Sequence, residues 1–386
     1  MLLNGLVKEL LVQKRRIKLE NNKTAKIIVG AQWGDEGKGK ISAYIVASDG
    51  AKYVARAGTG PNAEHGIFLK DEKTYLKTNQ LPLGWIFSDD AKICIGSGVA
   101  IDSQKLFAEM FKYKLSKERI ILDYRSPIIT PENIINDASS TRMREIGSTM
   151  SGVGPCRSDF INRIAKQVRD FPDTFSGITG DVGAILNDAC KRGEEVVIES
   201  SQGTLLSLAA SPFYPNVTSD NVTATAAMDD VLLNWQYVRD VVLVVKSMPT
   251  REGSRYSDGD MGKVEELSPE EIESMGLFEP SSIGGKMRRK AKGIDFDLLK
   301  YAVEINGATQ IALTFIDHYD PESKNAKVEK DLGLKARLLI DKIEDMFNIP
   351  VTFVDTGKAY DNIIDMRFHK KTLEFDRIDG KLIQFV

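Results

Sequence analysis

The sequence has few cysteines and no long apolar run. Among its 386 residues are three cysteines, Cys94, Cys156 and Cys190, which are too few and too widely spaced for a disulfide framework. No apolar stretch is long enough to span a bilayer. Near the N-terminus the basic residues follow the apolar stretch instead of preceding it, which is the wrong order for a secretory signal. We therefore expect a reduced, cytoplasmic protein with no membrane partner.

The sequence also has no excess of charge of one sign. It contains 52 Lys and Arg and 55 Asp and Glu, a formal net charge of −3, and the two signs are interspersed. This distribution lacks the basic footprint of a nucleic-acid-binding protein, so we expect no nucleic-acid partner. A small anionic ligand would need a local basic site instead.

What the sequence does contain is enough apolar residues, 42%, for a large core. Short apolar runs alternate with helical patterns along the chain, at 26–30, 53–56, 92–96, 119–122, 195–199, 240–246, 309–315 and 350–354. Strands that are apolar on both faces and alternate with helices predict an α/β fold with a mostly parallel central sheet covered by helices on both faces. In such sheets the ligand lies beyond the carboxyl ends of the strands.

Two terminal segments fall outside this pattern. We interpret residues 1–24 as an N-terminal extension, either an amphipathic helix or an accessory tail, and residues 368–386 as a C-terminal hairpin extension. The body of the chain, 25–367, is then one large domain. Within it, residues 252–295 are the most polar and glycine-rich part, where we expect an insertion or mobile loop with a short helix that begins after Ser268.

The most informative motif spans residues 26–41, Lys-Ile-Ile-Val-Gly-Ala-Gln-Trp-Gly-Asp-Glu-Gly-Lys-Gly-Lys-Ile. A buried strand should lead into a glycine-rich turn that ends at a helix N-terminus, where backbone amides, the helix dipole and a lysine can hold a phosphate. The motif is close to a P-loop, but Gly39-Lys40 replaces the usual Lys-Ser/Thr pair, so another oxygen must hold the metal. Asp35 is the obvious candidate. The alternative is an ordinary strand-to-helix turn with solvated charges.

The segment from Gly30 to Lys40 resembles the signature loop of adenylosuccinate synthetases, and the likeness continues in order to about Arg367. It implies a carbon–nitrogen ligase that uses Mg²⁺ and ATP or GTP to join L-aspartate to C6 of a purine nucleoside monophosphate. In such a ligase Asp35 removes the N1 proton of the purine, and Lys38 and His65 stabilise charge on the transferred phosphoryl group.

The resemblance implies roles for further residues. The purine nucleotide would be bound by Asn62, Thr149, Arg163, Gln202 and Thr218, with Arg163 reaching across a homodimer interface into the neighbouring site. The triphosphate would be bound by Gly34, Glu36, Gly37, Lys38, Gly39, Lys40, Asp317, Thr356 and Gly357. L-Aspartate would be bound by Lys286 and Arg288. The metal ligands would be Asp35 and Glu64, although Glu64 replaces a glycine whose carbonyl is the ligand in the family. Taken alone, these loops are equally consistent with ordinary turns and solvated charge runs.

Several departures from the family leave the substrates open. Phe315 replaces a lysine that accompanies Asp317 in selecting guanine, so the sequence does not decide between ATP and GTP. Gly-Ser-Thr at 147–149, Lys-x-Arg-Arg at 286–289 and a missing segment after Arg251 resemble the viral 2-aminoadenylosuccinate synthetases, which use dGMP, and a viral chain would act in the host cytoplasm. Asp35 is retained, as in ordinary synthetases. We favour dGMP as substrate, giving N6-succino-2-amino-2′-deoxyadenylate, over IMP. A nucleotide-binding switch without ligase activity is a distant alternative.

Overall fold

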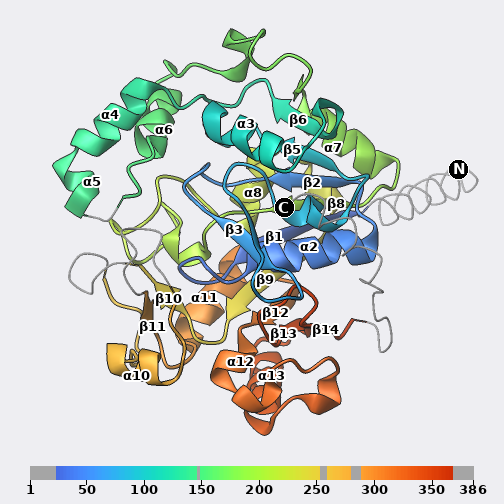
Figure 1. The fold of residues 1–386 in the computed structure, drawn as a ribbon, viewed down its shortest axis with the longest axis vertical. Helices are drawn as coiled ribbons and strands as arrows, with labels where there is room; N and C mark the ends of the chain where they lie inside the picture. Colours follow the sequence, from blue (N-terminus) through green and yellow to red (C-terminus); the bar gives the residue numbers. More distant parts are fainter. Residues whose placement is uncertain (1–22, 146–147, 253–258, 280–287, 368–386) are drawn as a thin grey trace, which may run out of the picture.

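The computed structural model describes residues 23–145, 148–252, 259–279 and 288–367, and the structural statements below concern these residues. Ten strands form one sheet in the order β14-β13-β12-β9-β1-β8-β2-β5-β6-β7 (Figure 1). All neighbouring pairs are parallel except β13 and β14. The strand bounds are β1 Ala25–Gly30, β2 Tyr53–Arg56, β5 Lys92–Ile95, β6 Ile120–Asp123, β7 Thr179–Gly180, β8 Val196–Glu199, β9 Val238–Lys246, β12 Gln310–Thr314, β13 Val351–Asp355 and β14 Ile363–Asp365.

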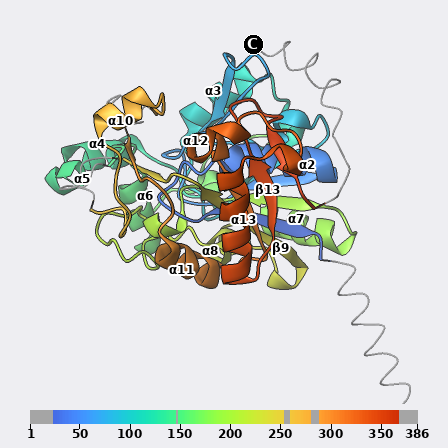
Figure 2. The ribbon, with the colours of Figure 1, turned by 90° about the horizontal axis from the view of Figure 1, so that it is seen from below.

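Helices cover both faces of this sheet (Figure 2). The helix bounds are α2 Lys38–Asp49, α3 Ser103–Lys112, α4 Pro131–Ser139, α5 Thr141–Glu145, α6 Val153–Ile161, α7 Val182–Lys191, α8 Ala224–Asp230, α10 Pro269–Ser274, α11 Phe296–Asn306, α12 Ile316–Tyr319 and α13 Leu334–Phe347. α2 and α3 pack on one face, against strand residues such as Ile28 and Val54, whereas α7, α8, α11 and α13 pack on the other, against the alternate residues such as Ile27 and Ala55. The inner strands such as β1 and β8 are buried on both sides, which is why each reads as a continuous apolar run.

The predicted α/β fold is confirmed, and the eight predicted strands correspond to β1, β2, β5, β6, β8, β9, β12 and β13. The helix expected after Ser268 is α10, whose N-terminus carries a capping box between Ser268 and Glu271. Two small antiparallel pairs were not predicted: β3 His65–Phe68 with β4 Tyr75–Thr78, and β10 Thr250–Arg251 with β11 Arg289–Lys290.

Some expectations lie beyond what the structure describes. Nearly all of the N-terminal extension (1–22), the whole C-terminal hairpin extension (368–386) and the segments 253–258 and 280–287 are outside the described residues. Within the described residues, no helix is both long and apolar enough to cross a membrane.

Candidate active site

The glycine-rich loop joins the end of β1 to the start of α2. Lys38 is the first residue of α2, and the residue before it, Gly37, has a φ of 85°. Gly34 (φ 87°) and Asp35 (φ 60°) also have left-handed backbones. The chain therefore reverses within a few residues and ends at a helix N-terminus, as the sequence predicts, which is a suitable place for a phosphate.

Glu36 holds the loop in shape from inside. Its fully buried carboxylate accepts hydrogen bonds from the amides of Gln32 (3.0 Å) and Gly34 (2.9 Å) and forms an ion pair with Lys38 Nζ (2.6 Å). We expected Glu36 among the groups that bind the triphosphate. In the structure its carboxylate is engaged within the loop, so its side chain shapes the loop and orients Lys38.

The segment after β8 packs directly against this loop. A Cβ atom on Gly30 would lie 2.4 Å from Glu36 Oε2 and 2.6 Å from the carbonyl oxygen of Gln202, so only glycine allows this approach. Gln202 itself has a left-handed backbone, with a φ of 55°. Two segments far apart in the sequence therefore meet at the carboxyl ends of adjacent strands, as expected for a ligand site in a parallel sheet.

His65 is held by two charged residues that end neighbouring strands. Its Nδ1 contacts the Glu199 carboxylate, and Arg56 Nη1 lies 2.8 Å from the same nitrogen. Arg56 and Glu199 are partners in the register of β2 and β8, and both are fully buried. The sequence placed His65 in a loop, whereas it is the first residue of β3 and is only 6% exposed. A Cβ atom on Gly39 would lie 3.1 Å from His65 Cβ, so His65 packs closely against the start of α2.

The charges around His65 fix its protonation. Burial, together with the charge of Arg56, lowers the pKa of His65 to about 4, so its imidazole is neutral at pH 7. Burial would raise the pKa of Glu199, but its neighbours His65 and Arg56 outweigh this effect and lower the pKa to about 2. The carboxylate also accepts hydrogen bonds from the amides of Leu83 (2.8 Å) and Gly84 (2.9 Å). An ionised Glu199 therefore orients a neutral imidazole.

Three of the residues expected to bind the purine nucleotide lie along the ends of β2 and β8 and the loop that follows. The hydroxyl of Thr59 donates to Asn62 Oδ1 (2.7 Å) and to Gln202 Oε1 (3.4 Å), which brings these two amides together. Thr218 is buried, and its Oγ1 has no hydrogen-bond partner within the described part of the chain. The same is true of Ser201 Oγ. Buried hydroxyls without partners are uncommon and mark places where a ligand can bond.

Thr149 and Arg163 differ from this group because both are exposed. Thr149 Oγ1 lies 2.9 Å from Ser151 Oγ in the loop before α6, and Arg163 follows the end of that helix with a φ of 65°. Arg163 is flanked by Ile161 and Ile164, which are 68% and 70% exposed. Exposed apolar side chains around an arginine are typical of a surface that another molecule covers.

Three other residues expected to bind the triphosphate, Asp317, Thr356 and Gly357, lie near Lys40. Its Nζ donates to Asp355 Oδ1 (2.7 Å) and to the carbonyl oxygen of Gly357 (2.7 Å), which ties α2 to the end of β13. Thr356 is buried and donates its hydroxyl to a backbone carbonyl. Asp317 is half-buried; burial, together with the charge of Asp355, raises its pKa to about 6. Lys40 and Lys324 also act on this carboxyl group, and their charges oppose the rise in its pKa without cancelling it.

Arg288 contacts the residue expected to act as base. Its guanidinium forms ion pairs with the carboxylate of Asp35 and with Glu252 Oε1 (3.1 Å). The structure therefore brings the proposed aspartate-binding arginine to the phosphate loop. The second expected aspartate ligand, Lys286, lies outside the described residues.

Glu64 points its carboxylate to β4. Its two oxygens accept hydrogen bonds from Tyr75 (3.2 Å) and Lys77 (2.7 Å). The sequence suggested a new carboxylate beside the metal, but in the structure these two partners engage that carboxylate. The backbone carbonyl of Glu64 is the group left for a metal ion.

A family model described as adenylosuccinate synthetase matches residues 27–177 and 161–324 of the chain. The chain belongs to the adenylosuccinate synthetase family. It is similar to the adenylosuccinate synthetase of Methanocaldococcus jannaschii, with 41% identity over 347 residues that cover 89% of this chain and 97% of that protein. With the adenylosuccinate synthetase of Thermococcus onnurineus it shares 38% identity over 344 residues, covering 88% and 98%.

Two solved structures share the fold of this ligase. A fully ligated adenylosuccinate synthetase from Plasmodium falciparum has a TM-score of 0.77 at 22% identity and covers 90% of this chain and 100% of that one. The cyanophage S-2L succinoaminodeoxyadenylate synthetase (PurZ), bound to dGMP and dATP as an energy donor, has a TM-score of 0.75 at 22% identity and covers 94% and 99%. As a member of the adenylosuccinate synthetase family, the chain is a carbon–nitrogen ligase.

The residues of this synthetase fit a Mg²⁺ ion that is completed by substrate. Mg²⁺ prefers oxygen ligands and is usually held by one or two carboxylates together with phosphate oxygens and water. The described residues contain no cluster of three or more His, Cys, Asp or Glu side chains suited to a metal. They do provide Asp35, which lies in a strained turn just before the N-terminus of α2 and whose carboxylate forms an ion pair with Arg288. A single carboxylate at that position matches a metal ion that arrives with a triphosphate.

Sequence reasoning missed the supporting residues of this synthetase site. Arg56 and Glu199 were recognised only as parts of strands, and the structural role of Glu36 was not expected. A usable signal was present, because Arg56 and Glu199 are the last residues of otherwise apolar strands. Buried charges at the carboxyl ends of adjacent parallel strands are typical of an active site.

Proposed function

We propose that this ligase joins L-aspartate to C6 of a 6-oxopurine nucleoside monophosphate, with IMP as its purine substrate, through a 6-phosphoryl intermediate. The observation that carries the proposal is the packing of His65 against Gly39, next to Lys38, at the N-terminus of α2. A phosphoryl group bound at that N-terminus would lie between the lysine and the imidazole. Asn62 and Gln202 line the adjoining strand ends, where a nucleotide would bring its base to that phosphoryl group.

The proposed chemistry solves a leaving-group problem. The oxo oxygen at C6 leaves poorly, so the enzyme first converts it into a phosphate ester. Asp35 accepts the N1 proton, O6 forms a bond to the γ-phosphorus, and the bond from that phosphorus to the β-phosphate oxygen breaks to release the diphosphate. The amine of aspartate then forms the bond to C6, and inorganic phosphate leaves with the former O6. Lys38 and the loop amides stabilise charge on the phosphoryl oxygens throughout.

His65 has a defined part in this scheme. Its Nδ1 donates to Glu199, so in the neutral ring Nε2 is the acceptor, and Arg56 Nη1 lies 3.1 Å from this nitrogen; we assign the tautomer from these contacts. The ring can donate to a phosphoryl oxygen only after it takes up a proton. Charge that develops on that oxygen favours protonation, and Glu199 stabilises the resulting imidazolium. When bound by Asp35, Mg²⁺ would supply charge neutralisation on the triphosphate.

IMP is supported by the relatives of this chain. Archaeal proteins that are 37–41% identical over about nine-tenths of its length are named adenylosuccinate synthetase. dGMP is the second candidate, because Ser148-Thr149 after Gly147 and the missing segment after Arg251 resemble the viral enzymes and because the PurZ structure shares the fold. A pocket for dGMP must bind the 2-amino group and tolerate the absent 2′-hydroxyl. A pocket for IMP has no acceptor for a 2-amino group and bonds to the 2′-hydroxyl.

We further propose GTP as the phosphoryl donor and a homodimer as the active assembly. An ionised Asp317 can accept two hydrogen bonds from the amide and amino groups of guanine, and adenine offers no such pair of donors. ATP is the second candidate, because Phe315 stands beside Asp317 without a lysine. The dimer is supported by the exposed surface formed by Ile161, Arg163 and Ile164, from which Arg163 would reach the neighbouring site.

One experiment tests these proposals. The purified protein is incubated with Mg²⁺, L-aspartate and each pairing of IMP, GMP or dGMP with GTP or ATP, and the products are identified by mass. With IMP and GTP, we expect a product in which aspartate is joined to the purine, together with an equimolar amount of inorganic phosphate. Product from dGMP in place of IMP would assign the chain to the second candidate. Absence of any aspartate-dependent product or phosphate release would overturn the ligase proposal and favour a nucleotide-binding switch.

A further inference from the structure

A buried cluster of charges lies behind Arg288, and the mechanism above does not use it. Glu279 Oε2 accepts a hydrogen bond from Lys246 Nζ (2.6 Å), and the other carboxylate oxygen contacts Lys290 Nζ. The side chains of Lys246 and Lys290 are 0% and 1% exposed. Burial raises the pKa of Glu279, but the two lysines outweigh it and lower the pKa to about 2, so the carboxylate is ionised.

Glu279 holds the chain on both sides of Arg289. Its backbone carbonyl accepts the amide of Arg288 (3.1 Å), and its carboxylate holds Lys290, two residues further on. Arg289 turns the other way, to an ion pair with Glu266 (2.6 Å). The guanidinium of Arg288 is thereby left on the opposite side, where it reaches Asp35.

The same carboxylate connects this segment to the phosphate loop. Lys246 ends β9, the neighbour of β1, and its backbone exchanges two hydrogen bonds with the side chain of Gln32, at 2.9 and 3.0 Å. Gln32 lies in the loop between β1 and α2. The contacts therefore run from the phosphate loop through Lys246 and Glu279 to Arg288.

We propose that Glu279 is a positioning residue that sets the aspartate-binding site at a fixed place relative to the phosphate loop, by neutralising Lys246 and Lys290 and holding the backbone of Arg288. The inference rests on the proposed function. Without the carboxylate, two buried ammonium groups lose the counter-charge that both contact, and the repulsion between them displaces β11 with Arg288. The nucleotide side is held separately, because Gln32 bonds to the backbone of Lys246.

The test is the kinetics of Glu279→Gln in the full chain. We expect the KM for L-aspartate to rise about tenfold or more, while the KM values of the purine nucleotide and the triphosphate and the kcat at saturating aspartate stay within about threefold, the signature of lost uniform binding. The double variant Glu279→Gln/Lys290→Gln removes one of the two facing cations, so most of the loss should be recovered. A purely structural role would weaken the binding of all three substrates together instead of raising the KM for aspartate alone.

Asp49→Asn is a matched control. Asp49 also lies between two cations, Lys26 (2.6 Å) and Arg367 (3.0 Å), but at the amino ends of the strands. It should lower thermal stability and leave the KM for aspartate within about twofold. If Glu279→Gln does not fold, Lys290→Gln replaces it, and we then expect a rise of about threefold in the aspartate KM alone.

The outcomes separate the inference from the proposed function. The inference is overturned if the wild-type protein is active and Glu279→Gln keeps the wild-type KM for aspartate. It is also overturned if the variant loses affinity for all three substrates together. Either result leaves the ligase function standing. A wild-type protein that releases no aspartate-dependent phosphate overturns both.

Discussion

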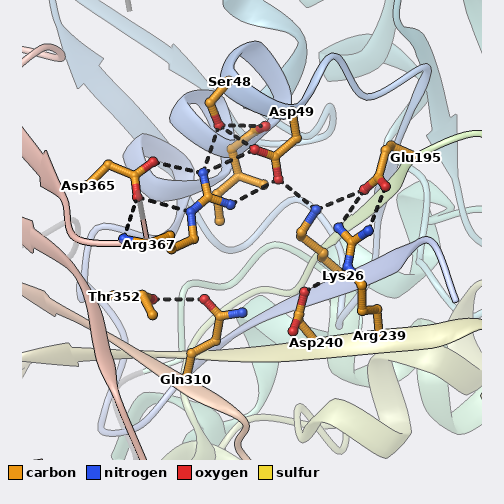
Figure 3. A network of polar contacts seen from close by, with 11 residues as sticks. Lys26, Ser48, Asp49, Glu195, Arg239, Asp240, Gln310, Thr352, Asp365 and Arg367 are labelled. Carbon is orange, nitrogen blue, oxygen red and sulfur yellow. Dashed lines mark hydrogen bonds and ion pairs between the residues drawn. The ribbon is translucent and has the colours of Figure 1, made fainter. Parts of the chain in front are cut away.

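The two ends of the central sheet differ in their polar contacts and in their backbone strain. At the amino ends of the strands, Lys26 on β1 lies between Asp49 (2.6 Å) and Glu195 (2.8 Å), and Arg367 joins the same Asp49 (3.0 Å) (Figure 3). Arg239 completes the group with two hydrogen bonds to Glu195. Each of these charges has a partner of opposite sign within the chain.

At the carboxyl ends, the chain leaves groups strained or unbonded. Asp35, Gln202 and Phe315 are non-glycine residues with left-handed backbones, at φ of 60°, 55° and 55°. Ser201 and Thr218 have buried hydroxyls for which the described residues provide no partner. Strain and unmet hydrogen bonds cost free energy and persist at functional sites. The clustered charges at the amino ends are thus paired within the chain, whereas the carboxyl ends gather strained backbones and buried hydroxyls where we propose that substrates bind.

The largest effect should come from Asp35→Asn at the carboxyl ends. Loss of the proton acceptor should reduce turnover by about 10³-fold, within the usual range for a general base. The free energy of unfolding should change little, because the left-handed turn tolerates asparagine. Aspartate-dependent phosphate release and thermal unfolding are measured together. Unchanged turnover would remove Asp35 from the role of base.

The reverse pattern is expected for Asp49→Asn at the amino ends. The change leaves Lys26 and Arg367 with one carboxylate fewer, and breaking such a buried pair should lower the free energy of unfolding by about 3 kcal/mol. Turnover at 25 °C should remain within about twofold of wild type. Denaturant unfolding and steady-state rates check both. A large loss of turnover with unchanged stability would contradict the proposed difference in role between the two ends of the sheet.

Asp230 gives the carboxyl ends a pH-dependent stability. Burial, together with the charge of Asp220, raises the pKa of Asp230 from 3.8 to about 7, and its carboxylate accepts the amide of Gly58 (2.7 Å). Because the folded-state pKa is raised, this contribution is complete below pH 4 and is lost as the pH rises to 7, by roughly 1.4 kcal/mol for each unit of pKa shift. Asp230→Asn should flatten the profile and stabilise the protein at pH 8. Unfolding measured from pH 4 to 8 that shows no difference would contradict this.

The smallest effect is expected for Thr218→Val. Its hydroxyl has no partner in the described structure, so stability should stay constant or rise by up to about 1 kcal/mol, whereas the KM for the purine nucleotide should rise several-fold. Thr352→Val is the matched control at the amino ends, where the hydroxyl bonds to Gln310 Oε1 (2.8 Å) (Figure 3). Thr352→Val should lower the free energy of unfolding by about 1 kcal/mol and leave the KM for the purine nucleotide unchanged. Equal effects of both variants on KM would argue against a ligand at Thr218.

The fold was predictable because most of its strands are short apolar runs that are easily recognised in the sequence. Runs such as 240–246 are apolar on both faces, which is typical of a doubly covered parallel sheet. The hairpin of β3 and β4 was not predicted, because Gly66 interrupts a four-residue strand and the partner lies beyond a turn. His65 was therefore placed in a loop, although the family resemblance assigned it to the same phosphoryl group as Lys38.

The individual segments of the candidate site were easier to predict from the sequence than the contacts between them. The phosphate loop and Arg288 are evident from glycine spacing and a run of basic residues. The contact of Arg288 with Asp35, and the hold of Glu199 on His65, join residues more than 100 positions apart. Local patterns carry no information about such pairs, since side-chain direction at the end of a strand depends on the neighbouring strand. The contact of Glu64 with Lys77 was not foreseen for the same reason, because Lys77 is on β4.

The bonds of Lys26 and Arg367 to one carboxylate have a practical consequence. Lys26 in the first strand, β1, and Arg367, just after the last strand, β14, are thereby joined through Asp49 at the amino ends of the strands. A short peptide bridge between positions 24 and 367, with new ends opened in an exposed turn such as the one at Gly193, should give a circular permutant that still folds.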